Sequence, residues 1–264
     1  MPTEEGDCII SGEFEGNIVI SADCEACFAS FSDGYHFDGR YYNVPMEAHD
    51  PKYQTGEPLK PSEVPAGVII SPDTLRGERI PPGQSRTRKW PVLDASGTPR
   101  VDPATWELRI FGLVDRPLTF NLEQFRALPR VKVFADFHCV TQWSRLSNFW
   151  EGVSTRELLD RSGIQAGAKF VLCHGYDNGW TTNLPLEDFL AKDALLADLH
   201  DGEPIPPDHG GPVRGMVPQL YAWKSAKWIR GIELLSFDRP GYWERGGYHM
   251  HGDPWKEERF GTGE

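Results

Sequence analysis

The stretch that best predicts the fold of this chain is 136-DFHCVTQWSRLSNFWEGVSTRELL-159. They begin inside Val131–Val140, a run of mostly apolar residues that is typical of a strand. Ser154 and Glu157 have the spacing of a capping box ahead of two leucines, and Gly163 is placed to end the helix that they begin. A polar turn follows the strand, and Cys139 stands where the strand meets the turn.

The pattern around this stretch is mainly that of strands. Asn121 and Gln124 have the spacing that opens a short helix, which would stop before Pro129. Further strands are expected at Thr105–Phe111, Lys169–Cys173, Ala194–His200 and Trp228–Phe237. Because strands dominate, helices are short and no regular βα alternation occurs, the sequence predicts a mixed α+β domain that is mainly β.

Composition argues against two classes of partner. The 264 residues carry a formal net charge of −12, which repels phosphate backbones and anionic lipids, so neither nucleic acid nor a membrane is expected as a partner. No apolar run approaches the roughly 18 residues of a membrane span. The first residues carry acids where a secretory signal carries Lys or Arg, and they include no twin-Arg pair. We therefore expect a cytoplasmic protein with five reduced cysteines.

Two regions of different composition are expected. Residues 71–264 have the pattern of one orderly domain, whereas residues 1–70 form an N-terminal extension of unknown role. The extension contains a possible strand at Asn17–Ser21 and ends in a polar, Pro-rich linker at 43–67.

The extension also contains a possible metal site. Cys24 and Cys27 have metal-ligand spacing, and Cys8 and His36 could complete a zinc set. A single pair with this spacing is weak evidence, so an unligated or redox-active cysteine pair is the alternative.

Several blocks of the sequence together resemble a known family. The blocks, in order, are RIPPGQSRTRKWPVL at 79–93, the opening stretch at 136–159, GWTTNLPLEDF at 179–189, DHGGPVRGMVP at 208–218 and WKSAKWIRGIELL at 223–235. From Ser71 onward the chain resembles the sulfite-oxidase-like, molybdopterin-dependent oxidoreductases, most of all their short bacterial haem-free members. The resemblance implies a mainly β molybdopterin-binding domain and a molybdenum–molybdopterin cofactor (Moco).

The resemblance implies that Cys139 is the protein's ligand to the metal. A thiolate is a soft donor that suits a metal already bound by the two sulfurs of a pyranopterin. The alternative is that Cys139 is a small buried apolar residue, as we expect for Cys173. A cysteine nucleophile paired with His138 is disfavoured, because neighbouring residues of a strand point to opposite faces.

The resemblance also implies which residues hold the pterin. The pattern H-G-x-P-V-R assigns His209 and Arg214 to the cofactor, and the following K-S-A-K-W loop assigns its phosphate end to Ser225, Ala226 and Lys227. The Gln84–Trp90 loop should cover the pterin, with Thr87 and Arg88 as the contacts, and Asp177 is a further candidate. The alternative for these cations is surface ion pairs, which we expect for Arg230.

The chain departs from sulfite oxidases where those bind sulfite. Paired arginines are replaced by Trp143 and Ser144, an active-site Tyr is replaced by Trp180, and Arg145 is the cation left nearby. The C-V-x-x-W-S pattern instead resembles the periplasmic methionine-sulfoxide reductase subunit. We therefore predict Cys139, Trp143, Arg145 and Trp180 as catalytic residues.

These residues predict an enzyme that transfers an oxygen atom to or from a small molecule, preferably by reducing a sulfoxide or another S- or N-oxide. The alternatives are sulfite oxidation and a cofactor-free binding module that kept the fold. Only 27 residues follow Phe237, too few for the family's dimerisation domain, so a monomer is expected. An unidentified electron donor or acceptor completes the reaction.

Overall fold

The computed structural model describes residues 57–261 and, before them, the backbone of four short strands at 13–14, 17–18, 35–37 and 40–42. These four strands form two antiparallel hairpins, β1 (Glu13–Phe14) with β2 (Asn17–Ile18) and β3 (Tyr35–Phe37) with β4 (Arg40–Tyr42). The strand expected at Asn17–Ser21 is thus present over its first two residues. Cys8, Cys24 and Cys27 lie outside the described residues, as does the zinc site expected there.

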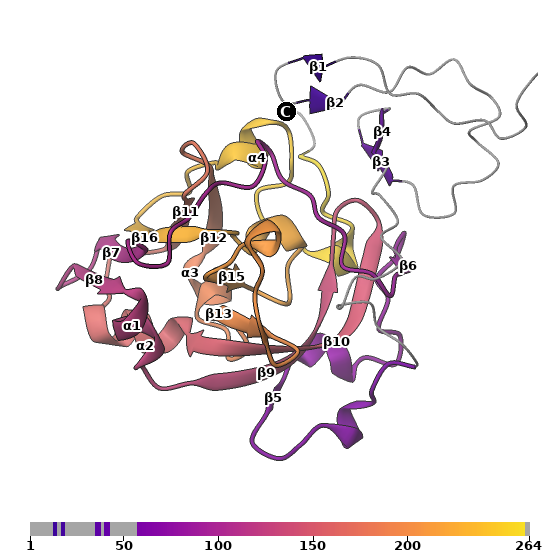
Figure 1. Ribbon diagram of the computed structural model, residues 1–264, viewed down its shortest axis with the longest axis horizontal. Helices are drawn as coiled ribbons and strands as arrows, with labels where there is room; N and C mark the ends of the chain where they lie inside the picture. The colour runs from indigo at the N-terminus through magenta and orange to yellow at the C-terminus, as the bar shows by residue number, and fades with distance from the viewer. Residues whose placement is uncertain (1–12, 15–16, 19–34, 38–39, 43–56, 262–264) are drawn as a thin grey trace, which may run out of the picture.

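A seven-stranded sheet forms one layer of the domain (Figure 1). Its strand order is β14 (Glu203–Pro204), β13 (Leu195–His200), β10 (Trp143–Ser154), β9 (Val131–His138) and β5 (Ile69–Ile70). Two short strands pair beside this path, β15 (Arg214–Met216) with β13 and β6 (Ser85–Arg86) with β10. β5 shows that the sheet takes in residues just before the expected domain start at 71.

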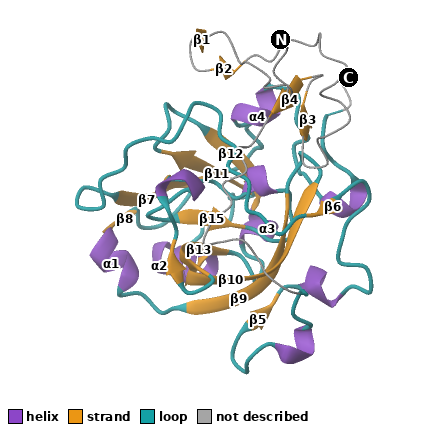
Figure 2. Cartoon of the chain, turned by 45° about the vertical axis from the view of Figure 1, so that its right-hand side comes forward, coloured by secondary structure: helices purple, strands orange, loops and turns teal. Residues whose placement is uncertain are grey.

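A five-stranded sheet forms the second layer, in the order β12 (Thr181–Pro185), β11 (Phe170–Gly175), β16 (Ile229–Leu235), β7 (Glu107–Gly112) and β8 (Leu118–Asn121). The α-helices are short: α1 (Leu122–Arg126), α2 (Thr155–Ser162), α3 (Leu186–Phe189) and α4 (Tyr242–Arg245). Figure 2 shows how little of the molecule they make up beside strands and loops. The mixed, mainly β fold predicted from the sequence is confirmed.

Local signals placed the two predicted helices, α1 and α2, correctly, whereas α3 and α4 were not predicted. Asn121 Oδ1 accepts a hydrogen bond from the Gln124 amide (2.8 Å), and Gln124 Oε1 accepts one from the Asn121 amide (2.9 Å), so the predicted capping box begins α1. Gly163 follows α2 with φ of 71°, a left-handed conformation that glycine adopts at little cost. At the start of α2 the Ser154 hydroxyl accepts from the amide of Arg156 instead of that of Glu157.

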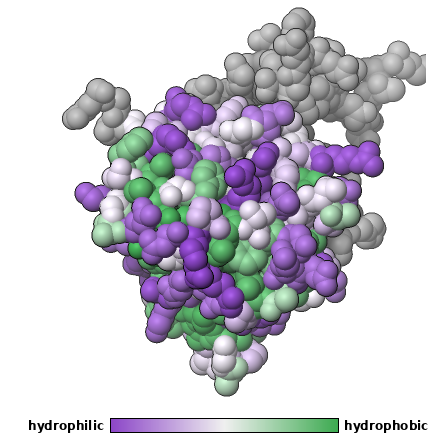
Figure 3. Space-filling model, turned by 90° about the vertical axis from the view of Figure 1, so that its left-hand side faces the viewer, coloured by the Kyte–Doolittle hydropathy of each residue, from purple (hydrophilic) through white to green (hydrophobic). Residues whose placement is uncertain are grey.

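Two hydrophobic clusters fill the interior, and strand alternation divides residues between them. Leu196 of β13 faces the first cluster, which covers the five-stranded sheet, whereas Leu195 and Ala197 face the second. The second cluster contains Cys139, at the turn between β9 and β10. On the face in Figure 3, hydrophilic side chains are interspersed with apolar ones. None of the helices described is long and apolar enough to cross a membrane.

Candidate active site

Cys139 lies in the tight turn that joins β9 to β10. Its amide donates to the carbonyl of Trp143 (2.9 Å), and the Gln142 amide donates to the carbonyl of Cys139 (3.0 Å). Gln142 has a φ of 70°, as the sharp reversal of the chain requires. The Thr141 hydroxyl donates to Cys139 Sγ over 3.2 Å. The sulfur is therefore held at the end of the sheet, as the sequence predicts.

Burial controls the chemistry of this thiol. It raises the pKa of Cys139, and the hydrogen bond from Thr141 acts in the opposite direction. His138, the preceding residue, places Nδ1 within 2.8 Å of the Ser144 hydroxyl, and burial lowers its pKa to about 3. His138 is thus neutral at pH 7 and engaged with Ser144, which argues further against a cysteine–histidine nucleophile. Cys173 lies in the first cluster, where burial raises its pKa to about 12, as expected of a core residue.

The loop predicted to cover the pterin runs alongside the Cys139 turn. The Ser85 amide donates to the carbonyl of Gln142 (2.8 Å), and the Thr87 amide donates to that of Ser144 (2.9 Å). The Thr87 hydroxyl accepts from the Lys89 amide (3.1 Å). The Arg88 side chain is partly exposed and lies 3.9 Å from Glu57. The loop backbone is therefore close to Cys139, while the two predicted contact side chains have partners within the protein.

Arg214 is the most deeply buried cation of the predicted set. It begins β15, and its guanidinium donates to the carbonyls of His209 (2.8 Å) and Ser225 (3.0 Å). Burial lowers the pKa of Arg214 to about 9, so the group is charged at neutral pH. Among the described residues, no carboxylate lies within ion-pair distance of it, since its partners are carbonyls and aromatic rings. A buried charge without a counter-charge is costly, which indicates an anionic ligand.

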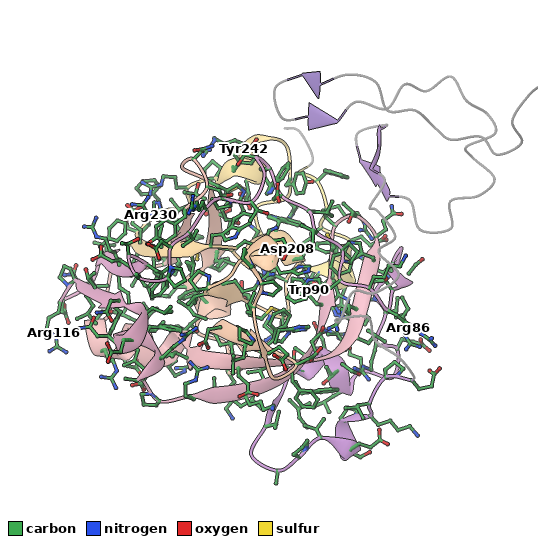
Figure 4. All side chains as sticks on the ribbon, in the orientation of Figure 1. Arg86, Trp90, Arg116, Asp208, Arg230 and Tyr242 are labelled. Carbon is green, nitrogen blue, oxygen red and sulfur yellow. The ribbon has the colours of Figure 1, made fainter. Side chains whose placement is uncertain are left out.

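Aromatic rings connect Arg214 to the cluster that contains Cys139. The Trp90 ring stacks on His209 with 3.8 Å between centroids, and the Arg214 guanidinium lies 5.7 Å from the Trp90 ring. Phe137 and Trp150 border the same guanidinium at 5.2 and 5.7 Å. In Figure 4, Trp90 lies near the middle of the domain, close to Asp208 in this view, whereas Arg116 and Arg230 lie toward its edges.

Lys227 is the second buried cation. Burial and, after it, the charge of Arg214 lower the pKa of Lys227 to about 8, so the two cations repel each other across a poorly solvated space. Lys227 Nζ donates to the carbonyl of Asp208 (2.9 Å) and lies 3.9 Å from Asp94. Burial also raises the pKa of Asp177 to about 6, with Lys227 acting against that shift. Of the predicted cofactor residues, the structure thus places Lys227 near both Arg214 and Asp177.

Near these cations, the backbone at Gly210 and Gly211 packs closely against Lys227 and Ile205. Gly210 has a φ of 102°, and a Cβ there would lie 2.9 Å from the Cα of Lys227. A Cβ on Gly211 would lie 2.0 Å from the carbonyl oxygen of Ile205. Larger residues would push these segments apart, so the Gly-Gly pair before Arg214 allows the backbone segments to approach closely.

The other cations of this region have different roles. Lys224 Nζ is fully buried and donates to Glu244 (2.6 Å) and to the carbonyl of Met250 (2.6 Å), so its charge is compensated. Arg230 is exposed on β16, with its guanidinium 5.1 Å from the ring of Tyr176. The expectation that Arg230 stays outside the cofactor site agrees with this placement.

The aromatic residues predicted to be catalytic lie in different clusters, and Arg145 belongs to neither cluster. Trp143 shares the second cluster with Cys139, and its buried Nε1 has no acceptor among the described residues. Arg145 is also buried, but its charge is compensated by Asp201 at 3.0 Å. Trp180 packs in the first cluster, at the loop before β12. Of the aromatic pair expected beside the metal, the structure therefore puts Trp143 in the cluster of Cys139 and Trp180 in the other.

Two residues near Cys139 were missed by sequence reasoning. Arg259 donates to the carbonyl of Val140 (2.9 Å) and is the cation that acts on the pKa of Cys139. Tyr221 packs in the same cluster, and the charge of Cys139 contributes to its raised pKa, which is due first to burial. Both residues are far from the turn in sequence, so no local pattern could have indicated their contact with it.

Comparisons with known proteins agree on one family. The family model described as the oxidoreductase molybdopterin binding domain matches residues 95–243. The chain is 49% identical over 183 residues to the oxidoreductase YuiH of Bacillus subtilis (strain 168), a match that spans 69% of this chain and 92% of that protein. It is 29% identical over 189 residues to the putative protein-methionine-sulfoxide reductase subunit YedZ1 of Azospira oryzae, spanning 70% of this chain and 71% of that one.

A solved structure shows a similar fold. The crystal structure of the sulfane dehydrogenase SoxCD from Paracoccus pantotrophus superposes with a TM-score of 0.50 at 25% sequence identity. The superposition covers 54% of this chain and 41% of the SoxCD chain.

Proposed function

This chain belongs to the family of oxidoreductases with a molybdopterin-binding domain, and we propose that it binds a molybdenum–molybdopterin cofactor whose metal is ligated by Cys139. The family resemblance predicted from the sequence blocks is confirmed, and the chain is an enzyme. The cofactor itself, the ligand and the substrate are our proposals, together with a domain boundary close to residue 71.

The observation that carries the proposal is the pair of buried cations, Arg214 and Lys227. Each loses hydration on burial, and each raises the cost of the other. A phosphate bound near both cations would supply the negative charge that Arg214 lacks, and it could accept hydrogen bonds from both side chains, although Lys227 also lies 3.9 Å from Asp94. The amides of Ala226 and Lys227 donate to no acceptor among the described residues, so they add two further donors for an anion. This donor set fits a pterin that carries a phosphate.

We propose the remaining cofactor contacts from the positions of the side chains around Arg214 and Cys139. His209 stacks on Trp90, and the carbonyls of His209 and Ser225 both accept hydrogen bonds from the Arg214 guanidinium. Asp177 is a buried acceptor that suits the N–H groups of a pterin ring. Thr87 and Arg88 stay proposed contacts through the loop that runs beside the Cys139 turn.

The surroundings of Cys139 favour a role as a metal ligand over a role as a core residue. Its thiol would lose its proton on binding a metal, and the Thr141 hydrogen bond stabilises the resulting thiolate. When bound, the cofactor supplies a metal that changes oxidation state by two electrons and exchanges one oxygen atom. The protein then excludes water, through the burial of the turn, and orients the sulfur.

We further propose that the substrate is a small neutral sulfoxide or another S- or N-oxide. The buried Trp143 N–H has no acceptor among the described residues, and an oxide oxygen would accept from it. Sulfite is a dianion and would require uncompensated cations near Cys139. The charge of Arg145 is compensated by Asp201, and Arg259 lies 3.8 Å from Glu257. The name of YedZ1 as a putative methionine-sulfoxide reductase subunit is consistent with this class. Arg145 and Trp180 stay predicted catalytic residues, but Arg145 is paired with Asp201 and Trp180 packs in the other cluster.

The electron partner is proposed to be a separate protein. YedZ1 is named as a subunit, which favours electron exchange across a protein interface. The chain is proposed to act in the cytoplasm as a monomer.

Metal analysis tests the cofactor. Protein from a molybdenum-replete, cofactor-competent host should contain about one molybdenum and one pterin per chain. Cys139→Ser replaces a soft thiolate by a hydroxyl and should abolish activity while the fold persists. Cys173→Ser is the matched control, since Cys173 is also buried but lies in the other cluster, and it should keep its molybdenum. Wild-type protein without pterin would contradict the proposal.

A substrate comparison tests the oxygen acceptor. Small sulfoxides and N-oxides should be reduced with a dye electron donor, and sulfite should be oxidised weakly or not at all. Efficient sulfite turnover at micromolar concentration would replace our proposal by the alternative reaction.

A further inference from the structure

Three separate parts of the chain meet at the turn Cys139–Gln142. From the preceding loop, Gln84 Nε2 donates to the carbonyl of Cys139 (3.0 Å), and the Ser85 amide donates to that of Gln142 (2.8 Å). From near the C-terminal end, Arg259 Nη1 donates to the carbonyl of Val140 (2.9 Å). Three carbonyls of this turn are therefore held by donors from outside it.

Arg259 joins two of these parts. Its Nη2 donates to the carbonyl of Pro82 (3.1 Å), so one planar guanidinium bonds the loop and the turn together. The same group lies 5.2 Å from the Tyr221 ring, which limits its rotation. The side chain is only 12% exposed. Arg259 lies beyond residue 243, where the match to the family model ends.

The segment that carries Arg259, Tyr248–Arg259, is itself fixed to the domain. The carbonyl of Gly252 accepts from the Tyr221 amide (2.8 Å). His251 lies between Glu258 (2.8 Å) and Asp188 of α3 (3.2 Å), so it ties the segment both to itself and to the domain. Arg259 is thus presented to the turn by an anchored piece of backbone.

We propose that Arg259 is a positioning residue of the active site, which holds the Cys139–Gln142 turn and thereby sets the direction of Cys139 Sγ. This inference rests on the proposed function, in which that sulfur ligates the metal. Outer groups that hydrogen-bond the segment of a metal ligand fix its orientation and tune the metal. Here the hydrogen bonds are made to backbone carbonyls next to the ligand. Arg259 donates to the carbonyls of Val140 and Pro82 at once, which a single N–H donor could not do.

Two variants and a control test the proposal in the full-length protein. Arg259→Gln removes the charge and the double contact, whereas Arg259→Lys keeps a charge and a donor that reaches one carbonyl. Arg116→Gln is the matched control, since Arg116 also donates to a backbone carbonyl, that of Arg161 (2.7 Å), from an exposed position. Arg116 lies at the edge of the domain in Figure 4.

Hydrogen exchange gives a readout that needs no activity. The Gln142 amide, which bonds to the carbonyl of Cys139, should exchange about tenfold faster in Arg259→Gln than in wild type. Amides of the distant strand β7 should not change in Arg259→Gln, and Arg116→Gln should match wild type at Gln142. If Arg259→Gln fails to fold, the same measurement is made on Arg259→Lys, which should show a smaller acceleration at the same amide.

Spectroscopy of the molybdenum-loaded protein gives the second readout. The paramagnetic molybdenum signal should shift in Arg259→Gln and shift less in Arg259→Lys, because the sulfur direction alters the metal's electronic structure. In Arg259→Gln, kcat should fall about 10- to 100-fold, while KM should stay within about twofold of wild type. A loaded Arg259→Gln variant with wild-type exchange and a wild-type signal would overturn the role of Arg259 alone. Wild-type protein without molybdenum would overturn the proposed function and this role with it.

Discussion

Replacing Arg214 by methionine should weaken cofactor binding without lowering the stability of the cofactor-free protein. The guanidinium is 3% exposed and donates to carbonyls of His209, Gly215 and Ser225. Its charge has no carboxylate partner among the described residues. Arg214→Met keeps much of the volume of the side chain and removes only its charge and its hydrogen bonds.

The size of each effect follows from burial. Removing a cation from a buried anion site costs about 2–4 kcal/mol of binding free energy. That corresponds to a loss of affinity for the cofactor of about 30- to 900-fold. In the cofactor-free protein, the lowering of the Arg214 pKa from 12.5 to about 9 reflects a burial penalty on the order of 5 kcal/mol. The charge-assisted hydrogen bonds to carbonyls offset much of that penalty, so Arg214→Met should leave the cofactor-free stability unchanged or raise it.

Two measurements separate the effects. Molybdenum and pterin per chain are determined after extensive dialysis, and thermal unfolding is followed on protein made without cofactor. Arg230→Met is the control, because Arg230 is exposed on β16 and should keep full occupancy. Full occupancy in Arg214→Met would show that no anion binds there. A loss of several kcal/mol in the stability of the cofactor-free protein would show that Arg214 acts through its internal hydrogen bonds and not as an anion-binding group.

Two further predictions concern Lys227 and Trp143. Burial lowers the pKa of Lys227 to about 8, and an anion binds the charged form, so cofactor retention should weaken as pH rises above 8. Dissociation rates of the cofactor measured over a pH series check this. The pH dependence of those rates should be smaller in Lys227→Gln. Without cofactor the sign reverses, because a lysine with a lowered pKa destabilises the fold while charged, so Lys227 makes stability rise with pH between about 8 and 10.5. Trp143→Phe removes an indole N–H that has no acceptor among the described residues, so it should change stability little and raise KM for a sulfoxide about tenfold; steady-state kinetics with an unchanged KM would exclude that hydrogen bond.

Much of the fold could be predicted because its signals are local. The Asn121–Gln124 capping box, the end of α2 at Gly163 and the strand before Cys139 each depend on residues a few positions apart. Alternation along a strand predicts which residues share a face, and the two clusters divide β13 in this way. Pairing between distant strands, such as β5 with β9, depends on contacts that no short pattern encodes.

The family, the cysteine at the turn and the cations Arg214 and Lys227 could all be identified from the amino-acid sequence, because each belongs to a motif of residues that are close together along the chain. Which of the charges remain uncompensated became clear only from the folded chain. Arg145 is close to Cys139 in sequence, yet Asp201 compensates its charge, whereas Arg259 is 120 positions away and reaches the turn. The physical reason is that charge compensation and desolvation depend on distance in space, and folding brings together groups that the order of residues keeps apart.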